Sequence, residues 1–354
     1  MQLHTLWFIV LAILWVGFFV LEGFDFGVGA LHALLGRTDT ERRVAINTIG
    51  PWWDGNEVWL VVAGAGTFAA FPAWYATMFS ALYLALLLVL VALMARGVAF
   101  EFRGKSDDPR WRAVWTWCMT LGGILVPLLL GVGLGDLLHG LPIDAQHNFT
   151  GDFFDLLTPY GLWTGVTLLG LCLLHGATFL KLRTTGPVRD RAAAAARPLG
   201  WVAIALVVGF AIWTRNIAGP AQVPGPLEVL AIIAVIFAAR LAVSDRDGWA
   251  FAASAVTIAA SVGSLFVALY PHVMISTINP AYSLTVANAA SGHYALVVMS
   301  IVTVVLLPVV LVYQGWSFYV FRARVAAPPS GEEPSTSVGG TAASAALRPA
   351  APQA

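Results

Sequence analysis

Four carboxylate side chains stand inside or beside strongly apolar segments near the amino terminus. They form two pairs, Glu22 with Asp25 and Asp54 with Glu57. A charged side chain in the hydrocarbon of a membrane costs about 2.5 kcal/mol or more, so such residues usually face a protein interior or a water path. Residues three positions apart share one face of a helix. Each pair therefore predicts an acidic stripe, and packing of the two helices would form a four-carboxylate cluster.

Clustered carboxylates can hold and release protons near neutral pH, and such groups relay protons in membrane proteins. The functional interpretation of the four acids is therefore a path for proton uptake. The structural alternative is that they pair with arginines or cap broken helices, and only hold the bundle together.

The composition predicts a membrane protein. Of the 354 residues, 59% are hydrophobic and only 11% are charged, which is more apolar than a soluble domain requires. Repeated apolar runs of about 20 residues indicate a polytopic all-α protein. The formal net charge of zero gives no basic surface for nucleic acid, so partners are expected within the membrane. The first apolar segment lacks a basic leader and contains acids, so we expect it to remain as the first span.

Nine transmembrane helices are predicted, at about 5–34, 52–71, 75–97, 114–138, 158–181, 198–214, 226–243, 248–270 and 294–321. With these spans, all of the 19 lysine and arginine residues except Arg215 lie on one side. The positive-inside rule makes that side cytoplasmic, with the amino terminus outside and the carboxyl terminus inside. Residues 1–324 would form the transmembrane domain. Residues 325–354, rich in Ala, Pro, Ser and Gly, are expected to be a disordered cytoplasmic tail.

This orientation places both acidic pairs in the cytoplasmic half of the membrane. Arg96, Glu101 and Arg103, at the end of the third predicted span, lie at a similar depth and are candidate counter-ions. The alternative is that they anchor the inner ends of the helices. The neighbouring pair Trp52-Trp53 favours an aromatic belt at the membrane surface over a stacking role.

Two histidines, His32 and His175, lie near the inner ends of the first and fifth predicted spans. They are interpreted as interior hydrogen-bonding groups, while haem ligation remains an alternative if they meet on facing helices. Cys118 and Cys172 fall in apolar stretches and are expected to be free thiols. The spacing of these residues matches no metal, nucleotide or nucleophile motif, so neither a catalytic residue nor a metal is predicted on this chain.

Three motifs together resemble subunit II of cytochrome bd-type quinol oxidases. They are Glu22–Gly29, Gly50–Leu60, and Ser276–Pro280 followed by Ser283–Thr285. The resemblance covers residues 1 to about 324. It implies a nine-helix subunit built as two four-helix bundles plus one peripheral helix.

The resemblance also implies a function. Subunit II pairs with a homologous subunit I in the inner membrane of a prokaryote. Subunit I carries haem b and haem d, whereas subunit II carries none and supports assembly of the complex. The complex oxidises quinol and reduces dioxygen to water with protons from the cytoplasm. Asp25 and Asp54, with Glu22 and Glu57 beside them, would border the proton path. A structural quinone occupies some members, and a small third subunit is a further candidate partner.

A proton-coupled secondary transporter is the alternative function, because transporters also use carboxylates within the membrane. Common transporter folds place broken helices at corresponding positions of two halves. Here the acids gather near one end of the chain, which disfavours that reading.

Overall fold

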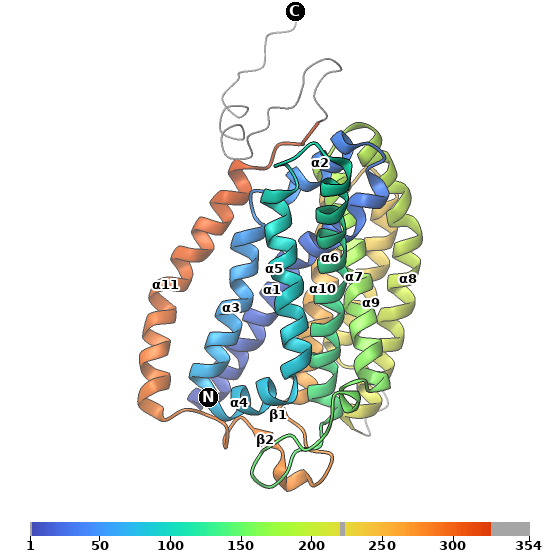
Figure 1. Cartoon of the computed structure of the whole chain (residues 1–354). Coiled ribbons are helices and arrows are strands. Elements are labelled where there is room, and N and C mark those ends of the chain that lie inside the picture. The colour runs from blue at the N-terminus through green and yellow to red at the C-terminus, as the bar shows by residue number, and fades with distance from the viewer. Residues whose placement is uncertain (1, 220–223, 327–354) are drawn as a thin grey trace, which may run out of the picture.

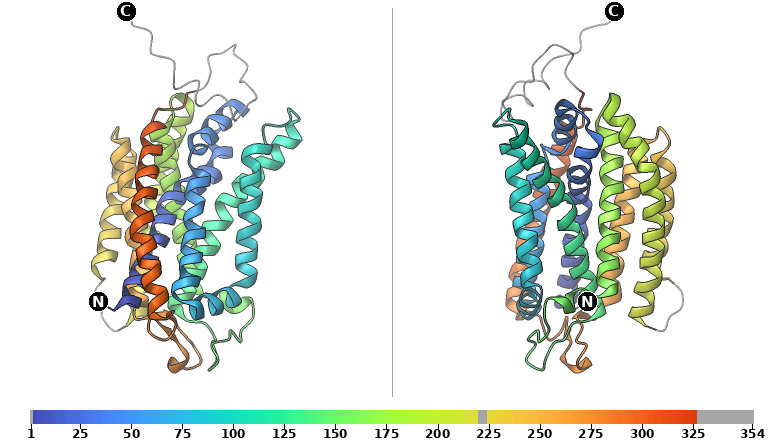
Figure 2. Two further views of the ribbon diagram at one scale, coloured as in Figure 1. Left: turned by 90° about the vertical axis from the view of Figure 1, so that its left-hand side faces the viewer. Right: turned by 45° about the vertical axis from the view of Figure 1, so that its right-hand side comes forward.

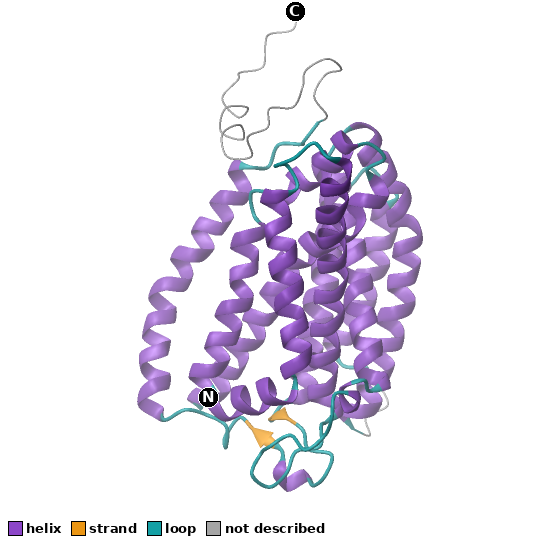
Figure 3. Ribbon diagram, in the orientation of Figure 1, coloured by secondary structure: helices purple, strands orange, loops and turns teal. Residues whose placement is uncertain are grey.

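The computed structural model describes residues 2–219 and 224–326, which are mainly helical, with two short strands and the connecting loops (Figure 1). The long elements are α1 (Leu3–Leu35), α2 (Asp39–Ile49), α3 (Trp53–Ala70), α4 (Pro72–Ala81), α5 (Tyr83–Phe102), α6 (Pro109–His139), α7 (Pro159–Arg183), α8 (Gly186–Ala218), α9 (Pro226–Ala242), α10 (Asp247–Leu269) and α11 (His293–Val320). Two 3-10 turns (Phe154–Leu156 and Pro280–Tyr282) and strands β1 (His272–Met274) and β2 (Leu284–Thr285) lie in the connections (Figure 3).

Each predicted span coincides with helix in the structure. Within the described part of the chain, seven helices are long and apolar enough to cross a membrane: α1, α5, α6, α7, α8, α10 and α11. Helix α3 has 18 residues and carries two carboxylates, and α9 has 17 residues. The predicted third span is divided, because α4 lies across the end of the bundle while α5 runs along it (Figure 1). The count of nine spans and their division into two four-helix bundles stay predictions.

Helix α1 lies at the centre and packs against α3, α6, α7 and α10. Every residue from Glu22 to His32 is buried. Small residues permit this close packing: a Cβ atom on Gly27 would lie 1.9 Å from the Cys172 carbonyl oxygen of α7, and one on Gly123 of α6 would lie 2.5 Å from the Phe26 carbonyl oxygen. The acid-bearing half of α1 is thus enclosed by protein.

Helix α11 lies at the edge of the bundle (Figure 1), and it is the red-orange helix in front in the left view of Figure 2. Leu296 is its one buried residue. Its contacts with the bundle include two hydrogen bonds: the Trp7 indole donates to the Leu296 carbonyl oxygen at 3.1 Å, and the Gln314 amide donates to Asn56 at 2.8 Å. A long helix with so little buried surface is available to lipid or to another subunit.

Helix α2 is a short polar helix at the basic end of the bundle. Thr38 and Glu41 form a capping box at its start, and Glu41 Oε1 lies 2.6 Å from the Arg191 guanidinium of α8. Burial alone would raise the pKa of Glu41. The hydrogen bonds from Arg191 and from the backbone N–H groups of Thr38 and Arg37 outweigh that effect and lower the pKa below its usual value.

The loop after α10 packs against the loop after α6. Strands β1 and β2 pair in antiparallel fashion, and the Ser276 hydroxyl donates to the Ile143 carbonyl oxygen at 2.7 Å. This joins two loops at the end of the bundle opposite α2 (Figure 1). The predicted tail lies outside the described residues from residue 327 onward.

The aromatic-belt prediction is wrong for Trp52. This side chain is 3% exposed and stacks on Phe318 of α11 with ring centroids 5.0 Å apart. The Arg183 guanidinium carbon lies 4.8 Å from the Trp52 ring centroid, a cation–π contact. Trp53 stacks on Phe100 at 4.5 Å. Both tryptophans therefore pack within the protein, because α5 and α11 cover the start of α3.

The crossing of α1 and α7 yields a stability prediction. Gly27→Ala would force the α7 backbone away from α1, and overpacking of this kind costs about 1–3 kcal/mol. The purified protein should unfold at a lower temperature in detergent. Gly64→Ala on α3 is the matched control, because nothing lies within 4 Å of its added Cβ atom. Equal melting temperatures for both variants would contradict the close crossing.

Candidate functional site

Arg96 of α5 lies at the centre of the polar cluster. Its side chain is fully buried and donates to Glu22 Oε1 of α1, while Arg96 Nη1 lies 3.8 Å from Glu57 Oε2 of α3. The rings of Phe26 and Phe100 lie 4.8 Å and 5.6 Å from the guanidinium carbon. A buried guanidinium needs compensating charge, and these acids supply it from two different helices.

Asn56 joins Asp25 to the neighbouring helices. Its amide nitrogen donates to Asp25 Oδ2 at 2.7 Å and to the Leu21 carbonyl oxygen at 3.1 Å. Its amide oxygen accepts from Gln314 Nε2 at 2.8 Å. Sequence reasoning missed both amides. The available signal was a polar side chain in an apolar helix, directly before Glu57.

The structure brings together three of the four predicted carboxylates. Glu22 and Asp25 are completely buried, and the Glu57 side chain is 25% exposed. Asp54 is exposed, so the expected four-carboxylate cluster is wrong in this respect. The reason is the rotation of α3. Asn56 faces α1, and a helix turns about 100° per residue, so Glu57 lies beside that face and Asp54 lies nearly opposite.

Several polar atoms of the cluster are buried without a hydrogen-bond partner among the described residues. They are Glu22 Oε2, Asp25 Oδ1, Glu57 Oε2, and Nε and Nη2 of Arg96. Buried polar atoms are normally satisfied by protein or by ordered water. An unpaired carboxylate oxygen can also take up a proton. The cluster can therefore bind water and exchange protons with it.

The remaining candidate counter-ions lie elsewhere. Arg103 pairs with Asp39 of α2 and donates from Nε to the Thr116 hydroxyl at 3.0 Å. Glu101 is exposed. Five residues separate it from Arg96, which is nearly one and a half turns, so the two side chains point to different sides of α5. The counter-ion interpretation is wrong for these two residues, and Arg103 serves as an anchor between α2, α5 and α6.

The two histidines are interior groups. His175 Nδ1 lies 2.7 Å from the Ser254 hydroxyl, and its Nε2 lies 3.2 Å from the Val20 carbonyl oxygen. Both ring nitrogens are thereby engaged with protein. His32 is buried with Nδ1 2.6 Å from the Gly29 carbonyl oxygen. Among the described residues there is no group of three or more His, Cys, Asp or Glu side chains that could hold a metal ion.

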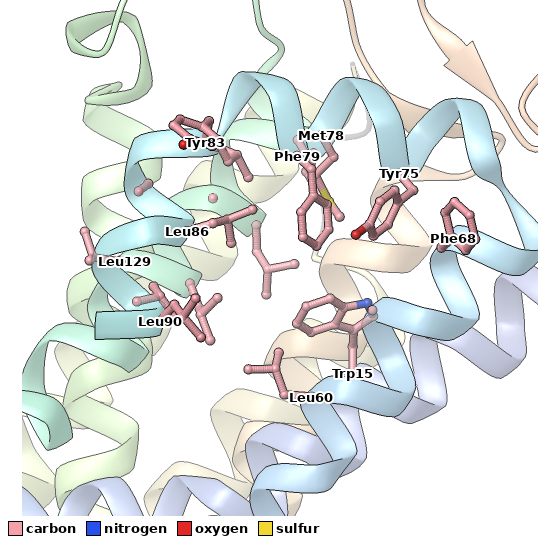
Figure 4. A pocket seen from close by; sticks show the side chains of 18 of the residues that line it. Trp15, Leu60, Phe68, Tyr75, Met78, Phe79, Tyr83, Leu86, Leu90 and Leu129 are labelled. Carbon is pink, nitrogen blue, oxygen red and sulfur yellow. The ribbon is translucent and has the colours of Figure 1, made fainter. Parts of the chain in front are cut away.

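An apolar cavity of about 630 Å³ lies between α1, α3, α4, α5 and α6 (Figure 4). Its wall includes Trp15, Phe68, Tyr75, Phe79 and Leu129. Tyr75 and Phe79 stack with ring centroids 4.0 Å apart. The size and the aromatic wall are typical of pockets for apolar small molecules.

Comparison with known proteins decides the family. The family model described as cytochrome bd terminal oxidase subunit II matches residues 3–321. The chain belongs to this family. It is 47% identical to cytochrome bd ubiquinol oxidase subunit 2 of Bacillus subtilis (strain 168) over 343 residues, which cover 95% of this chain and 99% of the relative. It is 35% identical to cytochrome bd-I ubiquinol oxidase subunit 2 of Escherichia coli (strain K12), over 91% and 95% of the two chains.

The fold agrees with this assignment. The chain is similar to a chain of the bd oxidase from Geobacillus thermodenitrificans with a TM-score of 0.68 at 17% identity, covering 91% of this chain and 99% of that one. The resemblance drawn from the three motifs is confirmed, and the transporter alternative is not favoured. This subunit II is an integral protein of the bacterial inner membrane and part of a cytochrome bd quinol oxidase complex, whose subunit I partner the family implies.

The Glu22–Arg96 pair generates a double-mutant prediction. Arg96→Gln leaves Glu22 as an uncompensated buried charge, which costs about 3–5 kcal/mol. The single variant should therefore yield little folded protein. Glu22→Gln combined with Arg96→Gln removes both charges and should recover much of the yield and the melting temperature in detergent.

Arg110→Gln is the control for the loss of an arginine, because Arg110 is exposed at the same end of the bundle. Equal losses in the single and double variants would show that the ion pair itself is not the source of the stability.

Proposed function

We propose that this chain is a non-catalytic subunit that supports the haem-bearing subunit I and provides its proton path. Quinol oxidation and the reduction of dioxygen to water then take place on subunit I, at haem b and haem d. The proposal depends on one observation: Glu22 and Asp25 are buried, ion-paired or hydrogen-bonded, and connected to Glu57 near the surface.

The carboxylates form an ordered series from water to the interior. Asp54 is exposed at the start of α3 and can exchange protons with water. Glu57 is partly exposed, lies one helical turn further along α3, and approaches Arg96. Glu22 and Asp25 follow inside α1. Neighbouring ionised carboxylates repel one another. The positive charge of Arg96 offsets this repulsion, because it stabilises the ionised carboxylates around it.

The exposed side of α3 is the proposed contact face for subunit I. Exposed apolar residues recur there at helical spacing, at Val58 and Val62, and Asp54 lies at the water-facing end of this stripe. An apolar stripe that begins at a carboxylate suits a protein partner better than lipid, because an ionised group is costly in hydrocarbon. Docking on this face would place Glu57 between the two subunits. The basic end of the bundle is then the cytoplasmic end, with the amino terminus outside.

The proton path predicts selective loss of turnover. Asp25→Asn and Asp54→Asn should each slow oxygen consumption by the purified complex severalfold, because an amide cannot carry a proton between carboxylates. Haem content, measured from the absorption spectrum, should remain normal.

Asp107→Asn is the control, because its carboxylate is exposed at the basic end and pairs with Arg112 outside the cluster. Loss of haem in both test variants would show that the acids are structural. Full activity in both would exclude the proton path.

We also propose that the apolar cavity accommodates the structural quinone that the family resemblance implies. The aromatic pair Tyr75 and Phe79 can stack on a flat ring, and the remaining wall suits an isoprenoid chain. The site is distinct from the polar cluster and would stabilise α4 and α5 against α1.

Filling the cavity tests this assignment. Ala85→Phe on α5 places a ring in the cavity wall and should sharply lower the quinone extracted from the purified complex by organic solvent. Ala205→Phe on the exposed side of α8 is the matched control and should leave the quinone content unchanged. Equal quinone content in the two variants would exclude this cavity as the site.

A further inference from the structure

A second cavity, of about 360 Å³, lies at the basic end of the bundle, away from the carboxylate cluster. It is formed by the end of α7, the first turns of α8 and the link between α9 and α10. Its lining residues are Lys181, Arg189, Ala193, Ala194, Arg197, Val243 and Asp245. Three of these side chains are cationic and one is acidic.

The first turns of α8 shape this cavity. Arg189, Ala193 and Arg197 are spaced four residues apart and so lie on one face of the helix. The small alanine between the two arginines leaves space that a longer side chain would fill. Two guanidinium groups therefore flank a recess on a single helix face.

Asp247 fixes the inner wall of the cavity. Its carboxylate lies 3.1 Å from Lys181 Nζ, 3.0 Å from Arg189 Nη2 and 2.9 Å from Arg324 Nη2. Lys181 also donates to the Ala242 carbonyl oxygen at 3.0 Å. A single carboxylate thus faces three cations and cannot neutralise them, so positive charge remains at the back of the cavity.

The front of the cavity carries further positive charge. Asp245 is exposed and lies 3.9 Å from Arg189, a weak contact. Arg197 is exposed and makes no ion pair with any residue that the structure describes. Arg189 Nε is buried without a hydrogen-bond partner within the same described ranges. The cavity therefore offers unused donors and a surplus of positive charge to an anion.

The position of the cavity relative to the membrane surface indicates which anion it would bind. Arg197 directly precedes the apolar part of α8, and α9 ends at Ala242 just before the lining residue Val243. Trp201 and Trp249 are 67% and 71% exposed on the adjoining helices, as expected for side chains at the membrane surface. The recess thus lies at the level of the lipid phosphates.

We propose that this cavity binds the phosphate headgroup of an anionic phospholipid from the leaflet at the basic end of the bundle. Arginine pairs give planar, multiple hydrogen bonds to phosphate oxygens, and basic pockets between helices at this level bind such headgroups. The bound lipid would tie α8 to the α9–α10 link. The proposal is independent of the proton path and of the quinone cavity.

The test uses the purified oxidase complex in detergent with added phosphatidylglycerol, and retained lipid is measured by native mass spectrometry. Arg197→Gln should lower retained phosphatidylglycerol severalfold without loss of folding, because Arg197 is exposed and unpaired within the described residues. Ala194→Leu, which fills the recess without a change in charge, should have the same effect. Arg110→Gln is the matched control for removal of a basic residue at the same end of the bundle.

Preference for phosphatidylglycerol over phosphatidylcholine, lost in both cavity variants but kept in Arg110→Gln, would support the site. Equal retention by Arg197→Gln and the unmodified complex, or equal losses in Arg197→Gln and Arg110→Gln, would overturn it. Thermal stabilisation by inorganic phosphate alone, as large as that by phosphatidylglycerol and lost in Arg197→Gln, would assign the cavity to free phosphate instead of lipid.

Discussion

The buried ion pair between Glu22 and Arg96 constrains the positions of α1 and α5, and with them much of the bundle. Neither charge is tolerable in this interior without the other. The pair fixes the depth and rotation of α5 against α1, and Glu57 fixes α3 in the same way through its approach to Arg96. Stability and function are therefore coupled here, since the groups proposed to carry protons also hold three helices in register.

Close helix crossings make this polar centre possible. Glycines at the contacts of α1 with α6 and α7 bring backbones together and exclude lipid from the acid-bearing half of α1. Around that half lie aromatic rings, including the stacked pair of Phe24 and Phe179 at 4.1 Å. Polar groups in such surroundings keep strong interactions because little solvent screens them. The same surroundings explain why each acid needs a specific partner.

The structure divides into regions with different proposed roles. The polar cluster lies between α1, α3 and α5, the apolar cavity lies between α1, α3, α4, α5 and α6, and the basic cavity lies at the start of α8. The exposed stripe of α3 and the peripheral helix α11 remain for a partner. Gln314 of α11 reaches Asn56, and Asn56 reaches Asp25. A partner that moved α11 would thereby alter the surroundings of a buried carboxylate.

The sequence by itself determined the membrane character, the approximate positions of most of the long apolar helices, the family and the acid-bearing motifs, because hydropathy and motif spacing are properties of neighbouring residues. It did not determine which side chains meet. Sequence reasoning gave Arg96, Glu101 and Arg103 the same candidate role, but only Arg96 lies among the acids, and Asn56 and Gln314 were overlooked. Trp52 was expected at the membrane surface but is buried, and Asp54 was expected in the buried cluster but is exposed. Helices that are apolar on most sides carry little periodic signal for their rotation, so only the packing of the whole bundle decided which face of each helix looks inward.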